Sequence, residues 1–160
     1  VLATEFSVME VPGHTLDHIA YFHDGSAPML FCGDTLFAGG CGRVFEGTFP
    51  MMLSSLESLA ALPEDTRVFC AHEYTLANLA FASAVEPDNS ALKERVAKAQ
   101  ATRARDESTV PSTISLELAT NPFLRCHQPA MQQALKSQGK LQGETAEQVF
   151  ATVRGWKDSF

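Results

Sequence analysis

The sequence predicts an α/β unit followed by an all-helical unit, with a boundary near residue 75. Short apolar runs separated by turn residues fill the first half, whereas helix-length patterns with capping residues fill the second. The charge changes at the same place. Residues 1–75 hold ten acidic and two basic residues, and residues 76–160 hold nine acidic and ten basic ones. We therefore divide the chain into units 1–75 and 76–160.

Four β-strands and one helix are predicted in the first unit. Residues 4–11 alternate, with Phe6 and Val8 on one face of the strand and Ser7 and Met9 on the other. Further strands are expected at residues 18–23, 29–32 and 67–70. A glycine-rich loop is expected at residues 37–47. A helix from Pro50 to about residue 62 has an apolar face formed by Leu53, Leu56, Leu59 and Ala60.

The second unit is predicted to be helical throughout. Helices are expected at residues 76–85, 90–105, 114–119, 130–137 and 146–158. Asp88, Asn89 and Ser90 supply N-cap residues for the second of these helices, because their side chains accept hydrogen bonds from a first turn. Thr145 and Gln148 have the spacing of a capping box in front of the last helix.

Composition argues against several classes of protein. The net charge of −7 disfavours nucleic acid or an anionic membrane as a partner, because both are negatively charged. No apolar run approaches a membrane span, and the first residues lack the basic leader of a signal peptide. The four cysteines have no C-x-x-C spacing. We interpret them as reduced thiols of a cytoplasmic protein rather than as a disulfide framework.

Three candidate metal ligands follow the ends of predicted strands. His14 comes after the first strand, Asp34 after the third and His72 after the fourth. Side chains at strand ends of an α/β sheet can reach a ligand beyond the sheet edge, and two imidazoles with a carboxylate suit a zinc or iron site. Each residue alone also fits a simpler role, a turn aspartate or a capping histidine. Three ligands are few for one catalytic metal and too few for two.

Several motifs make the chain similar to a known family. It resembles glyoxalase II, the hydroxyacylglutathione hydrolases of the metallo-β-lactamase superfamily, in the order and spacing of six segments. These are P-G-H-T at 12–15, F-C-G-D-T-L-F at 31–37, G-C-G-R-V-F-E-G at 40–47, H-E-Y-T-L-A-N at 72–78, N-P-F-L-R at 121–125 and R-G-W-K-D-S-F at 154–160. The resemblance covers essentially the whole chain.

The resemblance implies a fold and a reaction. The expected fold is the C-terminal part of the αββα metallo-β-lactamase sandwich in residues 1–75, followed by a helical substrate-binding domain in residues 76–160. The expected reaction is hydrolysis of S-D-lactoylglutathione, a 2-hydroxyacylglutathione thioester, to D-lactate and glutathione in methylglyoxal detoxification. Two divalent metal ions are implied, usually zinc, with iron or manganese as alternatives. They lower the pKa of a shared water toward about 7.

The resemblance also assigns roles to single residues. His14 corresponds to a ligand of the first metal, His72 to a ligand of the second, and Asp34 to the catalytic carboxylate that bridges both. Substrate contacts are expected from Arg43, Phe45, Tyr74, Arg154 and Lys157. The last two would clamp the glycine carboxylate of glutathione, whereas their spacing alone predicts a solvated cationic face of the last helix.

The main departure of the chain from the family is a missing motif. The chain lacks the motif T-H-x-H-x-D-H, which supplies most of the metal ligands of the superfamily. The spacing in residues 14–18 differs from that motif. We expect Asp17 to be exposed or to contact a metal ligand, and His18 to be structural or to orient a neighbour rather than bind a metal directly. We therefore expect a fragment with an incomplete site. Its uncovered apolar sheet face would allow association of copies, although the intact family is monomeric.

Two other functions stay open. The chain could belong to a binuclear hydrolase of another thioester, or it could be a non-catalytic fragment that binds glutathione or a protein. Bound metal and thioester turnover would separate these alternatives.

Overall fold

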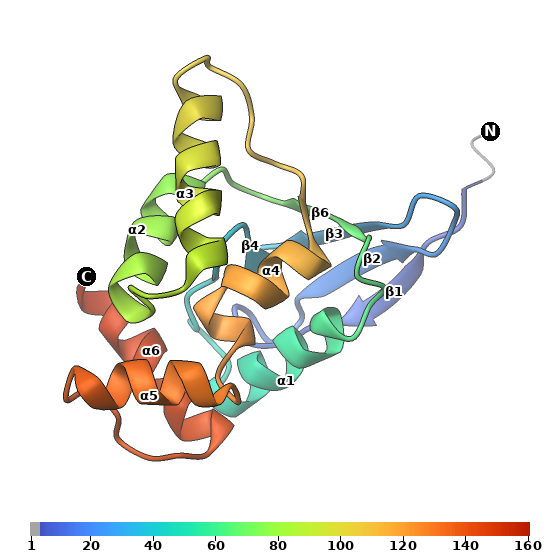
Figure 1. The fold of residues 1–160 in the computed structure, drawn as a ribbon. Coiled ribbons are helices and arrows are strands. Elements are labelled where there is room, and N and C mark those ends of the chain that lie inside the picture. The colour runs from blue at the N-terminus through green and yellow to red at the C-terminus, as the bar shows by residue number, and fades with distance from the viewer. Residues whose placement is uncertain (1–3) are drawn as a thin grey trace.

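The computed structural model describes residues 4–160, and its centre is a five-stranded mixed sheet. Its strands, in spatial order, are β1 (Ser7–Glu10), β2 (Ile19–His23), β3 (Met29–Gly33), β6 (Arg67–Cys70) and β7 (Ser112–Thr113). The pairs β1–β2 and β2–β3 are antiparallel, and β3–β6 is parallel (Figure 1). Strand β7 pairs antiparallel with β6. The four predicted strands are confirmed, although the first is shorter than expected. The part of the first unit at residues 1–3 lies outside the described residues.

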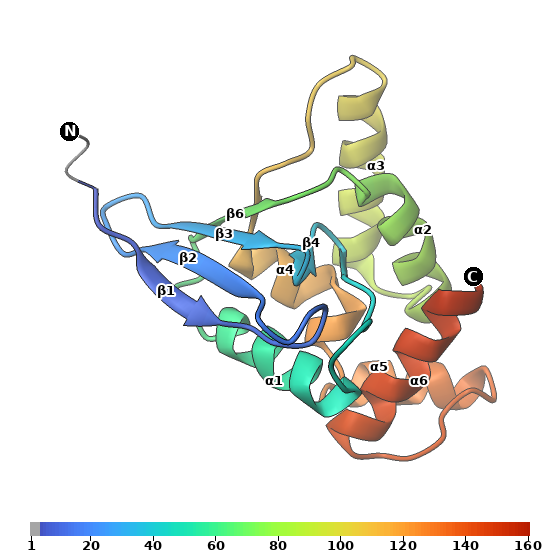
Figure 2. The same ribbon diagram turned by 180° about the vertical axis from the view of Figure 1, so that it is seen from behind.

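The two faces of the sheet differ in what covers them. One face packs against α1 (Phe49–Ala60), which lies along the sheet (Figure 2). On the other face, the strand register forms one apolar row from Val8, Tyr21, Phe31 and Phe69. Val8, Tyr21 and Phe31 are 61%, 45% and 39% exposed. The uncovered apolar face expected from the sequence is therefore present.

Helix α1 forms where the sequence predicts it. The Thr48 side chain caps its N-terminus by accepting a hydrogen bond from the Met51 amide. Pro50 fits the first turn, because the first amides of a helix have no intrahelical partner. The helix ends at Ala60 rather than near residue 62, because Pro63 follows closely and cannot continue a helix. Its buried apolar residues are Met52, Leu53, Leu56 and Leu59.

The predicted helices of the second half are also present. They are α2 (Thr75–Val85), α3 (Ser90–Arg103), α4 (Ile114–Thr120), α5 (Pro129–Ser137) and α6 (Ala146–Ser159). Asn89 caps α3, and Thr145 and Gln148 form the predicted capping box of α6. Local capping chemistry therefore sets these helix starts as expected.

Three short features were not predicted. The glycine-rich loop contains a hairpin of β4 (Leu36–Phe37) and β5 (Gly40–Cys41). Strand β7 comes from the half predicted to be helical, and the 3-10 helix η1 (Pro122–Leu124) follows α4. Elements of two or three residues carry no periodicity, so they are recognised only from their partners in space.

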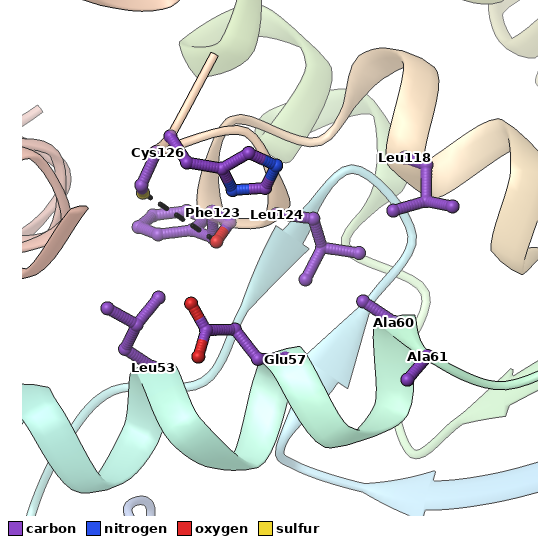
Figure 3. Close-up of a pocket in the computed structure, with 9 residues that line it drawn as sticks. Leu53, Glu57, Ala60, Ala61, Leu118, Phe123, Leu124 and Cys126 are labelled. Carbon is purple, nitrogen blue, oxygen red and sulfur yellow. Dashed lines mark hydrogen bonds between the residues drawn. The ribbon is translucent and has the colours of Figure 1, made fainter.

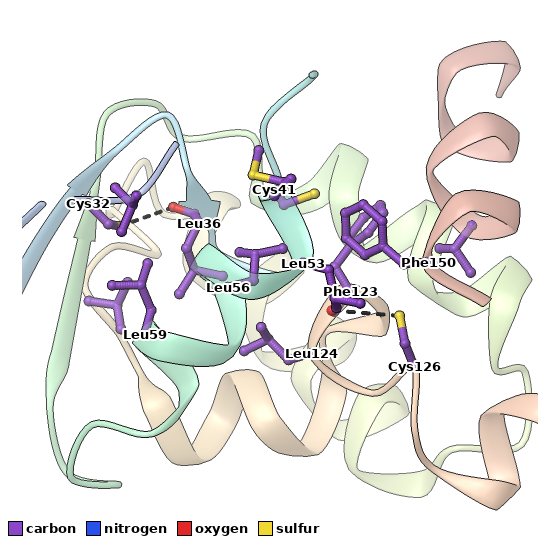
Figure 4. Close-up of a cluster of buried hydrophobic side chains, with 14 of the residues drawn as sticks. Cys32, Leu36, Cys41, Leu53, Leu56, Leu59, Phe123, Leu124, Cys126 and Phe150 are labelled. Carbon is purple, nitrogen blue, oxygen red and sulfur yellow. Dashed lines mark hydrogen bonds between the residues drawn. The ribbon is translucent and has the colours of Figure 1, made fainter. Parts of the chain in front are cut away.

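The apolar core joins the two halves of the chain. Phe123 and Phe150 of the second half belong to the same buried cluster as Leu36 and Leu56 of the first half (Figure 4). The rings of Phe123 and Phe150 meet edge to face at 5.7 Å between centroids. The division into units 1–75 and 76–160 stays a prediction, because a shared core does not itself mark a boundary.

The four cysteines are free thiols, and all except Cys70 are buried. Burial raises the pKa of the Cys41 thiol to about 11, because a thiolate is poorly solvated there. These thiols therefore stay protonated at neutral pH, and the alternative of a disulfide framework is wrong. Within residues 4–160, no helix has both the length and the apolar character needed to cross a bilayer.

Candidate metal centre

One cavity collects every site residue that the sequence predicts. Its volume is about 540 Å³, and its lining includes His14, Asp34, Arg43, Phe45, His72, Tyr74, Arg154 and Lys157. Loops that follow β1, β3, β5 and β6 supply the first six of these residues, and α6 supplies the last two. The fold therefore brings together residues that lie far apart in the sequence.

His14 has a defined tautomer. Its Nδ1 atom lies 2.8 Å from the main-chain oxygen of Arg43. A carbonyl oxygen can only accept, so Nδ1 carries the proton and Nε2 of the neutral ring is left with a lone pair. Metal-binding histidines commonly make this kind of outer hydrogen bond. Phe45 flanks the same ring, with 5.1 Å between the ring centroids.

Asp34 lies where β3 leaves the sheet. Gly33 has φ of +53°, a left-handed conformation that favours glycine, and the register with β6 shifts beside it. The Asp34 amide donates to Nε2 of His18 at 3.1 Å. His18 therefore orients the main chain of Asp34, which is one of the roles that the sequence predicts. The nitrogen that accepts this bond is not free to bind a metal. Asp17 is exposed, also as predicted.

His72 faces Asp34 across the ends of two parallel strands. Its Nε2 lies 3.5 Å from Oδ1 of Asp34, and the Ala71 amide donates to the Gly33 oxygen at 3.1 Å. Tyr74 stacks on the His72 ring at 5.1 Å between centroids. About half of the His72 side chain is exposed, so the imidazole stays accessible from the cavity.

These donors fit a divalent metal by chemistry but not by number. Two ligands of one tetrahedral zinc, each about 2.1 Å from it, lie about 3.4 Å apart. The 3.5 Å between His72 and Asp34 is close to that spacing. Among residues 4–160, no group of three His, Cys, Asp or Glu side chains is close enough to hold one ion. The assignment of His14 and His72 to different metals stays a prediction.

The predicted substrate contacts fall into two groups. Arg43, Phe45 and Tyr74 expose half or more of their surface at the cavity. Arg154 is buried, with 3% of its side chain exposed, and donates to the main-chain oxygens of Cys41 and Gly42. The alternative of a solvated cationic face is therefore wrong for Arg154, because α6 packs this side of the helix against the β5 segment.

The burial of Lys157 is intermediate between that of the exposed contacts and that of Arg154. The Lys157 ammonium group lies 5.0 Å from the centroid of the Phe81 ring and 3.4 Å from the Ala77 oxygen. Partial burial lowers the pKa of Lys157, and the nearby Arg154 charge lowers it further. Asp158 partly balances this cationic group, because its Oδ1 accepts from Arg154 at 2.9 Å and lies 3.9 Å from Nε of Arg43.

Comparison with known proteins identifies the family. A family model described as hydroxyacylglutathione hydrolase C-terminus matches residues 73–160. The chain belongs to the hydroxyacylglutathione hydrolase family. Residues 3–72 match the model of the metallo-beta-lactamase superfamily. The resemblance deduced from the motifs is therefore confirmed over both halves of the chain.

Curated relatives are similar along the whole chain. A hydroxyacylglutathione hydrolase of Pseudomonas aeruginosa (strain LESB58) is 58% identical over 160 residues, and one of Chromohalobacter salexigens is 54% identical. The matches cover 100% of this chain and 62% of each relative. The chain therefore spans less than two thirds of the length of these hydroxyacylglutathione hydrolases.

Solved structures support the fold. The BLEG-1 B3 metallo-beta-lactamase matches with a TM-score of 0.51 and 25% identity, over 78% of this chain and 43% of that protein. ETHE1 from Myxococcus xanthus matches with a TM-score of 0.52 and 21% identity, over 98% of this chain and 55% of that protein. The expected fold, part of a metallo-β-lactamase sandwich followed by helices, is confirmed.

Sequence reasoning missed three residues near the cavity and its supporting hairpin. Glu117 and Asn121 are fully buried, and both contact the β4–β5 hairpin. Asn121 begins the N-P-F-L-R motif that carried part of the resemblance, so a signal was present without an assigned role. Asp158 was also missed, although it lies beside Lys157 in the closing motif.

A second cavity lies apart from the predicted ligands. Its volume is about 350 Å³, and it lies between α1 and the segment from α4 to His127 (Figure 3). Leu53, Phe123 and Leu124 contribute apolar walls, and Glu57 is the acidic residue among its lining. None of the predicted site residues lines it, so the candidate site is the larger cavity.

Proposed function

We propose that this chain forms the substrate-binding side and part of the metal centre of a hydrolase that converts S-D-lactoylglutathione to D-lactate and glutathione. The observation that supports this most is the single cavity where His14, Asp34 and His72 meet Arg43 and Lys157. The names of the relatives, hydroxyacylglutathione hydrolases at 50–58% identity, support the same substrate class.

We infer that His14, Asp34 and His72 hold two divalent ions, zinc in the first place and iron or manganese as alternatives, because imidazole and carboxylate suit each metal. Such ions supply Lewis acidity toward a thioester carbonyl and make water acidic enough to act as a nucleophile. His14 and His72 would each supply an imidazole, and Asp34 would supply a carboxylate. Further ligands therefore have to come from outside residues 4–160 or from solvent.

The protein groups around these ligands prepare the site. The Arg43 carbonyl holds His14 in the tautomer that presents Nε2, and His18 accepts from the main chain of Asp34. Both bonds come from groups of the protein itself, so they orient the predicted ligands within the fold. Preorganisation of this kind is what a metal site requires of the protein around it.

Glutathione is an anion, so a chain of net charge −7 needs local cations to bind it. We propose that Lys157 and Arg43 contact its carboxylates directly at the cavity wall. Arg154 contributes positive charge to the cavity without a direct contact to the carboxylate, because its buried guanidinium already donates to Cys41, Gly42 and Asp158. Tyr74 and Phe45 supply exposed aromatic surface for the peptide backbone of the substrate. The free thiols support a reducing compartment, and we place the protein in the cytoplasm.

The test is hydrolysis of S-D-lactoylglutathione by this chain and by an extended protein. In the extended protein, the N-terminal portion of the Pseudomonas aeruginosa relative precedes residue 1. We expect turnover by the zinc-loaded extended protein and little turnover by the chain alone. No turnover by the extended protein with zinc, iron or manganese would contradict the proposal. If Lys157→Ala leaves KM for glutathione thioesters unchanged, the proposed contact between Lys157 and glutathione is contradicted.

A second candidate function is binding of glutathione without turnover. It is favoured by the finding that residues 4–160 hold no group of three metal-binding side chains. S-methylglutathione titrated into the zinc-free chain measures this binding. Binding by the chain, together with an extended protein that neither retains zinc nor hydrolyses the thioester, would establish the second function over the first.

A further inference from the structure

The loop at residues 35–43 connects two parts of the candidate metal centre. Asp34 lies at its start, and the carbonyl of Arg43 at its end accepts from His14. The two arms of the loop are in direct contact. The Gly42 amide donates to the Thr35 oxygen at 3.2 Å, and a Cβ atom at Gly42 would collide with the Asp34 carbonyl. The position of this loop therefore influences two of the three predicted ligands.

Side chains from a distant part of the sequence hold the tip of this loop. Nδ2 of Asn121 donates to the oxygens of Gly40 at 2.9 Å and Phe37 at 3.3 Å. Oε2 of Glu117 accepts from the Gly39 amide at 2.9 Å. Neither Asn121 nor Glu117 has any exposed surface. The tip of the hairpin is therefore bound through its main chain, in addition to the packing of its buried side chains Leu36 and Phe37.

Asn121 and Glu117 are themselves fixed. They are joined by a bond of 2.9 Å from Nδ2 of Asn121 to Oε2 of Glu117, and Oδ1 of Asn121 accepts from the Phe123 amide at 3.1 Å. Glu117 also forms a buried ion pair with Arg95 and accepts from the Ser112 hydroxyl. A buried polar network whose members are all paired is rigid, because each broken bond would leave an unsolvated polar group.

We propose that Asn121 and Glu117 are positioning residues of the metal centre, which act through the main chain of residues 37–40 to hold Asp34 and the His14–Arg43 pair in place. The effect on metal binding and turnover rests on the proposed function, whereas the effect on His14 does not. The alternative is a purely structural role, in which the pair only stabilises the end of α4.

The Asn121→Asp variant tests the positioning role with little change in the shape of the side chain. The variant keeps an oxygen that can accept from Phe123, but it replaces the Nδ2 donor with an oxygen that faces two carbonyls and Glu117. Asn121→Ser is the second variant, because it removes the same two loop bonds without adding charge. Leu135→Ala is the matched control, since Leu135 is fully buried in α5 and makes no hydrogen bond to the loop. It should destabilise the fold without moving the loop.

The main measurement is the tautomer of His14 in this chain, read from the nitrogen NMR signals of the neutral imidazole. We expect the Nδ1–H form in the unmodified chain and in Leu135→Ala, and a mixture of tautomers in both Asn121 variants. In the extended protein, the zinc dissociation constant should rise about 10- to 100-fold in those variants, as for loss of an outer partner of a ligand. The turnover number should fall more than KM changes.

The possible results distinguish the positioning role from the proposed function. If both Asn121 variants keep the Nδ1–H tautomer and bind zinc within about twofold of the unmodified protein, the positioning role is overturned. If the tautomer changes only in the Asn121 variants while no extended protein hydrolyses the thioester, the positioning role holds and the proposed function fails. If Asn121→Asp does not fold, Asn121→Ser decides between the same results.

Discussion

Nδ1 of His14 donates to the main-chain oxygen of Arg43 at 2.8 Å, so the residue with an exposed guanidinium also fixes the tautomer of a predicted metal ligand. The two roles proposed for Arg43 use different atoms. Its carbonyl orients the imidazole, and its side chain faces the cavity. Substitution of the Arg43 side chain should therefore affect substrate affinity while leaving the His14 tautomer intact.

His14→Ala should weaken zinc binding by the extended protein. The expected rise in the dissociation constant is at least the roughly 100-fold that loss of an outer partner can cause, because a ligand itself is lost. Competition with a chromophoric chelator measures it. His23→Ala is the control, because Nδ1 of His23 also bonds to a main-chain oxygen, that of Glu5, but His23 does not line the cavity. Equal zinc affinity in both variants would exclude His14 as a ligand.

Arg154→Ala and Arg43→Ala should differ in their effect on stability. Arg154 is buried, and its loss removes the donor that it supplies to the Cys41 oxygen and one of the donors to the Gly42 oxygen. We expect the free energy of unfolding to fall by about 2–3 kcal/mol. Arg43 exposes 66% of its side chain, so its replacement should change stability by less than about 0.5 kcal/mol. Urea unfolding measures both variants, and equal losses would contradict the burial of Arg154.

Binding of a glutathione carboxylate should weaken at high pH because of Lys157. Burial is the first cause that lowers the pKa of Lys157, and the charge of Arg154 is the second. The Lys157 cation is therefore lost as pH rises, at a lower pH than for an exposed lysine of pKa about 10.4. The dissociation constant of S-methylglutathione, followed from neutral to alkaline pH, should rise below that value.

The matched variant for this pH effect is Lys157→Arg, which keeps its charge throughout the range. An unchanged pH dependence in Lys157→Arg would show that another group is responsible.

The lowered pKa of Lys157 also affects the stability of the fold. Because the folded state holds the Lys157 proton less tightly than the unfolded chain, burial costs stability at neutral pH, and this cost is relieved as pH rises.

The uncovered apolar face of the sheet should cause copies of this chain to associate. Phe31→Lys places a charge in the exposed row formed by Val8, Tyr21, Phe31 and Phe69. We expect self-association to weaken about tenfold or more, because burying an unpaired charge costs well over 1.4 kcal/mol. Sedimentation velocity over a range of concentrations measures it.

Leu76→Lys is the control for association, since Leu76 is 42% exposed on α2 and lies outside the sheet. The two variants change charge equally. If both reduce association to the same extent, the sheet face is not the contact surface.

Features that depend on neighbouring residues were predictable from the sequence. The capping box of Thr145 and Gln148 and the N-cap Asn89 were correct, because these side chains bond to amides only three residues away. The strands that end before His14, Asp34 and His72 were correct as well, since apolar runs bounded by turn residues define them locally.

Tertiary structure alone decided which polar side chains are buried and what they hold. Arg154 and Lys157 share a helix face, but only the packing of α6 on the β5 segment buries Arg154 against Cys41 and Gly42. Strand β7 exists only because β6 pairs with it, and Asn121 reaches Gly40 only through the fold. The sequence by itself determined the family, the local elements and the candidate ligands. The supports of those ligands come from hydrogen bonds between distant segments, which leave no periodic or local pattern in a sequence.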